Sequence, residues 1–510
     1  MSSIWDRPSS GDASWDNRDN HGVEKGDFDG WDNTVQDTGN HENIDPRSSG
    51  HDAQRTTTPD ESGDFACRNC AWQVGPAASE AMIGREVYAY ADSPGKWRRP
   101  SPFASVQASI KYIIYLTLEN HSFDNIAGYW DFHPDIDNLR NISYCNEYTN
   151  ANWAVWGEPL EICAAPYETE VPLADPDHNF AGVTDEIFRK WNVTKHDVSN
   201  MGGFIERQSE KYESTPGDAA FVIKAYDQKK TALLAELAQN FTFFDSYVGC
   251  RDFAEHSGPT NANRQFATPG SSCGFVDNTD QAAGFWNNVT GTTCATSVFE
   301  SLSNKNISWK NYYETDIIDA YMYKWVQDNA MHQLVNADEF YRDLEQGTLP
   351  TFSYINPECC TIDSMHPTSP MASGEQMIKH LYDALRRSKY WDNALLIINF
   401  DEHGGFADHV PPPMDVPQPE DNISFTGTSD GHHVSYDFTH LGVRVPAFLI
   451  SPFISANTLI HNEGTMYAKN SAYTHSSILH FLQELWDLEG LNNRVQWAKT
   501  FEHVFEQPPG

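Results

Sequence analysis

Short apolar runs of strand length alternate with longer stretches of helical period along most of the chain, beginning near Lys111. Apolar runs of this kind are typical of strands buried on both faces, whereas the longer stretches keep one apolar face. The alternation predicts an α/β fold with a mainly parallel sheet covered by helices on both sides. The expected strands are KYIIYLTL, FTFFDSYV, ISWKNYY, TFSYIN, ALLIINF and VPAFLIS, and the expected helices are TALLAELAQN, EQMIKHLYDALRRSKY and HSSILHFLQELWDL.

The N-terminal part of the chain differs from the rest in composition. Its first 66 residues hold 15 acidic and 5 basic residues and show no sustained periodicity, which predicts a disordered acidic tail. The CRNC stretch at Cys67–Cys70 lacks a second ligand pair at zinc-knuckle spacing, so no zinc site is expected there. We therefore expect a tail and linker over residues 1–100 and one domain over 101–510, with 130–220 as an irregular decoration near the active face.

The charge of the chain restricts its partners. Its 510 residues include 72 Asp and Glu against 34 Lys and Arg, a formal net charge of −38. Such a surface repels nucleic-acid phosphates, so no nucleic-acid partner is expected, and an anionic substrate would need a bound cation. No run reaches the ~18 apolar residues of a membrane span, so no transmembrane segment is expected.

Two features of the sequence favour a secretory route, although no signal peptide is evident. Cys145 with Cys163, and Cys273 with Cys294, bracket short polar loops as disulfides would. Six Asn-X-Ser/Thr glycosylation sequons also occur, at Asn141, Asn192, Asn240, Asn288, Asn306 and Asn422. These features suggest an extracellular location, but the sequence leaves the localisation open.

Two of the expected strands end in metal-binding side chains. IIYLTL runs into Glu119 and Asn120, and ALLIINF runs into Asp401 and Glu402. Ligands bind beyond the carboxyl ends of strands in open α/β sheets, and three clustered carboxylates repel one another unless a proton or a cation intervenes. Strand-end acids are often merely solvated, but two such strands in one chain predict a divalent metal site.

A third stretch, EHSGPTNANRQFATPG, combines a hydroxyl, an amide and a guanidinium. Thr260 follows a Pro, and Asn263 and Arg264 stand three and four residues further on. Alone, such a stretch is more often an ordinary turn with a capping Thr. Together with a metal site it suits nucleophilic attack on phosphorus, in which Arg264 would grip phosphate oxygens.

These stretches resemble, in order, the signature blocks of the phosphoesterase family, which holds phospholipases C and acid phosphatases. The blocks are ENHSFDNIAGYW, GPTNANR, the MHP of SMHPTSP, FDEHGGFADHVPPP and RVPAFLISPF, within residues 111 to 490, and the resemblance is nearest to fungal members. The resemblance implies a three-layer α/β/α sandwich with an alkaline-phosphatase-like core. It also implies a metal-assisted phosphoester hydrolase with a Ser or Thr nucleophile.

The resemblance also assigns roles to individual residues. Thr260 stands at the nucleophile position, and His366 corresponds to an active-site histidine. His178 and His409 lie in family-like stretches and are further candidates, while His475 is expected to support the site from a helix start. The implied ligands of the divalent metal ion are Glu119, Asn120, Asp401 and Glu402.

The expected chemistry is a two-step displacement through phosphothreonine, with His366 or His409 protonating the leaving alcohol. The substrate is a phosphoester, and a phospholipase C-type diesterase is preferred over an acid phosphomonoesterase. A non-catalytic binding protein that retains the fold is the alternative of another class. Every motif-matched position holds a competent residue, which argues against that alternative.

Overall fold

The structure is a computed structural model, and it describes most of the chain beyond the N-terminal region. The expected tail and linker at 1–100 lie outside the described residues. The described residues are 103–149, 160–167, 169, 171–245, 252–278, 295–314, 319–357, 363–460 and 471–505.

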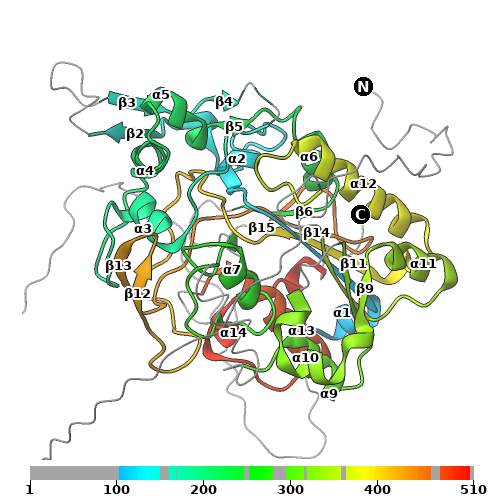
Figure 1. The fold of residues 1–510 in the computed structure, drawn as a ribbon. Helices are drawn as coiled ribbons and strands as arrows, with labels where there is room; N and C mark the ends of the chain where they lie inside the picture. Colours follow the sequence, from blue (N-terminus) through cyan, green and yellow to red (C-terminus); the bar gives the residue numbers. More distant parts are fainter. Residues whose placement is uncertain are drawn as a thin grey trace, which may run out of the picture. The chain divides into compact units, whose positions relative to one another are not determined.

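A sheet of eight strands forms the centre of the described domain (Figure 1), in the order β15-β6-β14-β11-β1-β10-β8-β9. Seven strands share one direction, and β14 alone runs antiparallel to its neighbours β11 and β6. The α/β class with a mainly parallel sheet is therefore as expected. The strands are β1 (Tyr112–Leu118), β6 (Thr242–Phe244), β8 (Trp309–Tyr313), β9 (Leu334–Asn336), β10 (Phe352–Asn356), β11 (Ala394–Phe400), β14 (Ala447–Ile450) and β15 (Thr458–Ile460).

All six expected strands contribute to this sheet, because each is an apolar run that only a doubly covered strand can bury. In β1, Ile113 and Tyr115 pack into one hydrophobic cluster, while Ile114 and Leu116 alternate with them and are equally buried. The weakly apolar edge strands β9 and β15 were not predicted, since three residues give too little pattern.

Helices cover both faces of the sheet (Figure 1) and complete a three-layer sandwich. On one face, α1 (Phe103–Ser109), α9 (Val298–Asn304), α10 (Lys324–Asn329) and α13 (His475–Trp486) share a hydrophobic cluster with the strands. On the other face, α6 (Ala232–Asn240), α11 (Asp338–Gln346) and α12 (Met371–Arg387) pack side by side. The three expected helices correspond to α6, α12 and α13.

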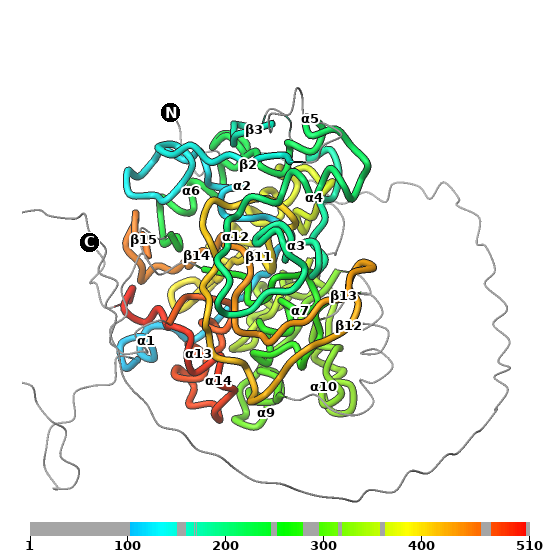
Figure 2. The backbone as a smooth tube through the Cα atoms, turned by 90° about the vertical axis from the view of Figure 1, so that its left-hand side faces the viewer, coloured from blue at the N-terminus to red at the C-terminus, as the bar shows by residue number. Residues whose placement is uncertain are grey.

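The decorating region is more regular than the sequence predicts. It contains a hairpin of β2 (Cys145–Tyr148) and β3 (Leu160–Cys163), and the helices α3 (Phe180–Phe188), α4 (Phe204–Lys211) and α5 (Pro216–Ala219). Figure 2 shows these elements gathered together, apart from α9 and α14 (Asn493–Trp497). Short helices were missed because their periodicity is brief, although Asn179 and Thr215 cap α3 and α5 with side-chain oxygens.

Candidate active site

The two acidic strand ends meet at one edge of the sheet. β1 and β11 are parallel neighbours, and Leu118 pairs with Phe400 at their last shared position. The next residues therefore lie side by side, and the Asn120 backbone N–H donates to Asp401 Oδ1 over 3.3 Å. Glu119, Asn120, Asp401 and Glu402 are all at most 1% exposed. Four polar side chains are thus buried together where both strands end.

A close approach of two turns fixes this arrangement. Asn120 adopts a left-handed conformation with φ 61°, and Gly404 opposite has φ 64°. A Cβ at Gly404 would lie 2.3 Å from the Asn120 backbone oxygen. Only glycine fits this backbone contact without a shift.

Arg264 supplies the positive charge of the cluster. It lies one turn into α7 (Thr260–Phe266) and is 1% exposed. Its Nη2 donates to Glu119 Oε1 over 2.6 Å, its Nε to Asp401 Oδ2 over 2.9 Å, and its Nη1 to Asp319 Oδ2 over 3.1 Å. The guanidinium thus joins three carboxylates and is buried among them. The expected grip on phosphate oxygens would require it to face the substrate instead. Asp319 carried no sequence signal, because it stands in a connection rather than at a strand end.

Two buried oxygens in the cluster lack a hydrogen-bond partner among the described residues. These are Asn120 Oδ1 and Glu402 Oε1. Burial, followed by the neighbouring charge of Asp401, raises the pKa of Glu402 well above its usual range. Unsatisfied buried oxygens are costly, and an oxygen-lined site of this kind fits a hard divalent cation. The residues predicted to hold a metal therefore fit that group chemically.

Thr260 begins α7, one helical turn before Arg264, and is 7% exposed. Residues four apart lie on the same helix face, so Thr260 shares the face that carries Arg264 to the carboxylates. Within the described part of the chain, the Thr260 hydroxyl has no recorded hydrogen bond.

Asn263 holds the turn before Thr260. Its Oδ1 accepts from the His256 backbone N–H over 3.0 Å, and its Nδ2 donates to the Gly258 carbonyl over 2.8 Å. Asn263 thus fixes the shape of the turn that leads to Thr260. Its role in catalysis stays a prediction.

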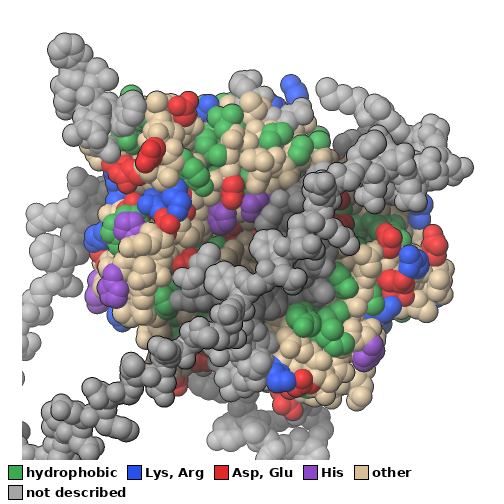
Figure 3. Space-filling model, in the orientation of Figure 1, with side chains coloured by type: hydrophobic (Ala, Val, Ile, Leu, Met, Phe, Trp, Pro, Cys, Tyr) green, Lys and Arg blue, Asp and Glu red, His purple; other side chains and the backbone are tan. Residues whose placement is uncertain are grey.

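Two histidines from separate loops face the same cluster. His178 Nε2 lies 3.4 Å from Asn120 Nδ2 and 4.0 Å from Glu402 Oε1. The His366 ring centre is 6.0 Å from that of His178, and Asp175 lies beside both. Burial lowers the pKa of His366. Figure 3 shows histidine and acidic side chains surfacing next to each other between α2 (Phe123–Ala127) and α7, on the face seen in Figure 1.

His409 belongs to a different network from the other candidates. Its Nδ1 lies 2.7 Å from Asp124 Oδ2 and its Nε2 3.2 Å from Asp137 Oδ1. Burial alone would lower the pKa of His409, but these two carboxylates outweigh it and raise the pKa to about 9. Arg444 also binds Asp124, over 3.0 Å. The recorded contacts of His409 thus tie it to a structural ion network rather than to the strand-end cluster.

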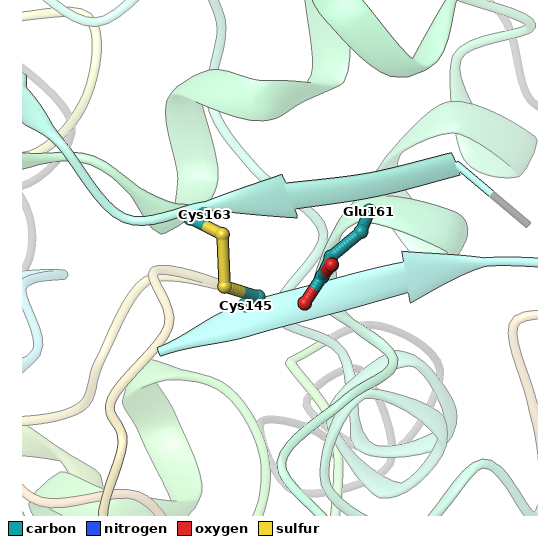
Figure 4. A group of neighbouring side chains, drawn as sticks. All are labelled: Cys145, Glu161 and Cys163. Carbon is teal, nitrogen blue, oxygen red and sulfur yellow. A yellow bond between two sulfur atoms is a disulfide. The ribbon is translucent and has the colours of Figure 1, made fainter. Parts of the chain in front are cut away.

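His475, at the start of α13, supports the cluster as expected, since its Nε2 lies 2.6 Å from the Asp401 carbonyl. A group formed by Cys145, Glu161 and Cys163 looks at first like a cation site, but its two sulfurs are joined in a disulfide (Figure 4). This bridge is one of the two expected pairs. Cys273 is also disulfide-bonded, and its expected partner Cys294 lies outside the described residues.

Comparison with known proteins gives the class of the chain: it is a hydrolase of phosphoric esters. More particularly, residues 110–489 match the model of the Phosphoesterase family, and the chain belongs to that family.

Similar proteins are phospholipases C from a plant and a bacterium. Non-specific phospholipase C1 of Arabidopsis thaliana is 32% identical, over 78% of this chain and 72% of that protein. Non-specific phospholipase C6 of the same plant is 30% identical, with the same coverage. Non-hemolytic phospholipase C of Burkholderia pseudomallei is 27% identical, over 73% of this chain and 55% of that protein. The expected kinship with fungal members stays a prediction.

Among solved structures, a protein of the alkaline phosphatase superfamily from Vibrio parahaemolyticus is 11% identical. The match has a TM-score of 0.31 and covers 55% of this chain and 64% of that one. The fold assignment therefore rests on the sheet order itself. Within the described part of the chain, no helix combines the length and apolarity needed to cross a bilayer.

Proposed function

We propose that this chain is a phospholipase C-type phosphodiesterase with Thr260 as its nucleophile and a divalent cation held by the strand-end cluster. The observation that carries the proposal is the convergence of Glu119, Asn120, Asp401 and Glu402, two of whose buried oxygens accept no hydrogen bond from the described residues. The phospholipase C relatives support the diester as substrate.

A bound divalent cation supplies positive charge that lowers the pKa of a hydroxyl and polarises a phosphate oxygen. Glu119, Asn120, Asp401 and Glu402 are the residues that would hold it. Arg264 keeps three carboxylates in register by binding one oxygen of each. Its role in the proposal is therefore to position the carboxylates.

The Thr260 hydroxyl gives its proton to solvent, its Oγ1 attacks the phosphorus in line, and the bond to the diacylglycerol oxygen breaks as the Oγ1–phosphorus bond forms. Of the two histidines expected to protonate the leaving alcohol, His366 is the one beside the strand-end cluster. Water then attacks the phosphothreonine, releases the phosphorylated head group and restores the hydroxyl.

The test compares p-nitrophenyl phosphorylcholine, a diester, with p-nitrophenyl phosphate, a monoester, across pH 4 to 8. Thr260→Ala should lower diester turnover by about 10³-fold or more, while Thr260→Ser keeps a hydroxyl and part of the activity. A chelator should abolish turnover, and added divalent cations should restore it. Normal turnover by folded Thr260→Ala would refute the nucleophile, and preference for the monoester would make the chain an acid phosphatase.

We also infer that the chain is a glycoprotein of an oxidising compartment. The Cys145–Cys163 disulfide supports this, as does the exposure of every sequon asparagine in the described residues. Treatment of the natively expressed protein with peptide N-glycosidase should lower its mass, and an unchanged mass would contradict the inference. These asparagines are Asn141, Asn192, Asn240, Asn306 and Asn422.

A further inference from the structure

The loop that carries His178 toward the strand-end cluster is held by α4. Arg207 of that helix is 4% exposed, and its Nε donates to Asp177 Oδ2 over 2.6 Å. The next residue of the helix, Gln208, accepts from the Asp177 backbone N–H through its Oε1 over 3.1 Å. Both the carboxylate and the backbone of the residue before His178 are therefore bound by α4.

Two further contacts fix the same loop. Tyr212, which follows α4, donates its hydroxyl to the Asp175 carbonyl over 2.8 Å. Gly405, in the turn after β11, has φ 71°, and a Cβ there would lie 2.4 Å from the Asp177 carbonyl oxygen. The loop thus contacts both α4 and the turn that begins at Glu402.

The Arg207 guanidinium also reaches the hairpin of β12 (Phe425–Ser429) and β13 (His432–Tyr436). Its Nη2 lies 2.5 Å from Oδ2 of Asp430, in the turn of that hairpin, and its Cζ lies 5.2 Å from the centre of the Trp191 ring. In Figure 1, α4 and this hairpin lie on either side of α3, the helix that the loop enters. A buried guanidinium with partners in several elements is held in one place, so it gives the loop a fixed anchor.

The position of the loop decides which way the Asn120 carboxamide faces. His178 Nδ1 lies 2.8 Å from the Pro176 carbonyl. Because a carbonyl only accepts, Nδ1 carries the proton and Nε2 presents a lone pair. That Nε2 lies 3.4 Å from Asn120 Nδ2, which donates to it. The opposite atom of the carboxamide, Oδ1, accepts no hydrogen bond from the described residues and is left for a cation.

We propose that Arg207 is a positioning residue of the candidate site and acts on the proposed cation through His178. By holding Asp177, it keeps the His178 ring against the Asn120 carboxamide, whose oxygen then stays directed at the cation. Groups that orient a metal ligand from outside change metal affinity by about 10–100-fold. The inference rests on the proposed function, because it needs the cation of the strand-end cluster. Arg207 lies in the decorating region, outside the signature blocks.

The test is isothermal titration of the metal-stripped full chain with Mg²⁺, repeated with Ca²⁺. Arg207→Met and His178→Ala should each weaken cation affinity by about 10-fold or more. The double variant should bind no more weakly than His178→Ala alone, because Arg207 acts through His178. A merely structural role would instead lower the affinity in both backgrounds.

Arg189→Met is the matched control. Arg189 also forms an ion pair with α4, through Glu206, but its recorded partners among the described residues lie outside the His178 loop. This variant should bind the cation as wild type does. Hydrogen–deuterium exchange over residues 173–182 should be faster in Arg207→Met than in either wild type or Arg189→Met.

Asp177→Asn is nearly isosteric and replaces Arg207→Met in the cycle should that variant fail to fold, with circular dichroism as the check. The inference is overturned if the folded Arg207 or Asp177 variant binds the cation as wild type does, or if its loss of affinity adds fully to that of His178→Ala. A folded wild type that binds neither ion would refute the cation of the proposed function and this inference with it. Normal binding by the wild type with additive losses would overturn this inference alone.

Discussion

Arg264 is the residue on which the charge balance of the site depends. Its guanidinium contacts carboxylates that follow β1, precede α10 and follow β11. Removing one partner from a buried ion pair leaves uncompensated charge in a medium that solvates it poorly. Removal of Arg264 would leave three carboxylates in this buried site without their positively charged partner.

We expect Arg264→Met to lower the free energy of unfolding by about 3–5 kcal/mol, the cost of breaking a buried ion pair. Urea denaturation measures it. Arg342→Met is the matched control, because Arg342 is 54% exposed and its ion pairs recorded among the described residues are with Asp338 and Glu339 of its own helix, so its loss should cost about 0.5 kcal/mol or less. Equal losses in the two variants would show that Arg264 does not hold the carboxylates together.

His409 should make stability depend on pH in the alkaline range. Its folded pKa of about 9 lies above the ordinary value of 6.5, so its stabilisation is complete below pH 6.5 and is lost as pH rises through 9. Between pH 6 and 10, the wild type should lose roughly 3 kcal/mol more unfolding free energy than His409→Gln. Parallel pH profiles for the two proteins would contradict the Asp124 and Asp137 contacts.

At the scale of elements, the turn after β11 matters because it touches the turn after β1. Gly404 and Gly431 both have positive φ, 64° and 80°. A Cβ at Gly404 meets the Asn120 backbone at 2.3 Å, whereas a Cβ at Gly431 meets nothing within 4 Å. Comparing substitutions at the two positions therefore separates the free-energy cost of a side chain in a left-handed backbone from the cost of pushing the two turns apart.

Each Gly→Ala variant should lose about 1–2 kcal/mol from the left-handed backbone alone. Gly404→Ala should also weaken binding of the proposed divalent cation by 10-fold or more, on the order of 1.4 kcal/mol, because Asn120 must shift. Isothermal titration with Mg²⁺ or Ca²⁺ measures this, and Gly431→Ala should bind as wild type. Unchanged affinity in Gly404→Ala would exclude Asn120 as a ligand.

For the whole molecule, the net charge of −38 should govern which lipid surface can be approached. We expect vesicles of phosphatidylcholine to be cleaved faster than vesicles that also contain an anionic lipid. The difference should shrink with salt, because the screening length falls from about 30 Å at 0.01 M to 3 Å at 1 M. Soluble p-nitrophenyl phosphorylcholine is the salt control, and faster cleavage of anionic vesicles would contradict the expectation.

Most of the sheet can be predicted from the sequence, because each of the six expected strands is a recognisable local apolar run. β1 and β11 are unbroken apolar runs followed at once by acidic residues, so both their existence and their convergence could be read in advance. Asp319 and Asp175 could not be found the same way, because their importance depends on distant partners in space. His409 shows the converse. Its motif resembles a family block, yet its recorded contacts are with Asp124 and Asp137 rather than with the strand-end cluster.

The central place of β1 has a consequence for biosynthesis. β1 is among the first segments of the described domain to leave the ribosome, yet its sheet neighbours β10 and β11 begin at residues 352 and 394. At about 5–20 residues per second, β1 waits roughly 10–50 s for its first neighbour. During that time both of its edges and its apolar side chains are unprotected. We expect a nascent chain of this topology to gain from chaperone shielding, and no truncated product ending before residue 401 can assemble the strand-end cluster.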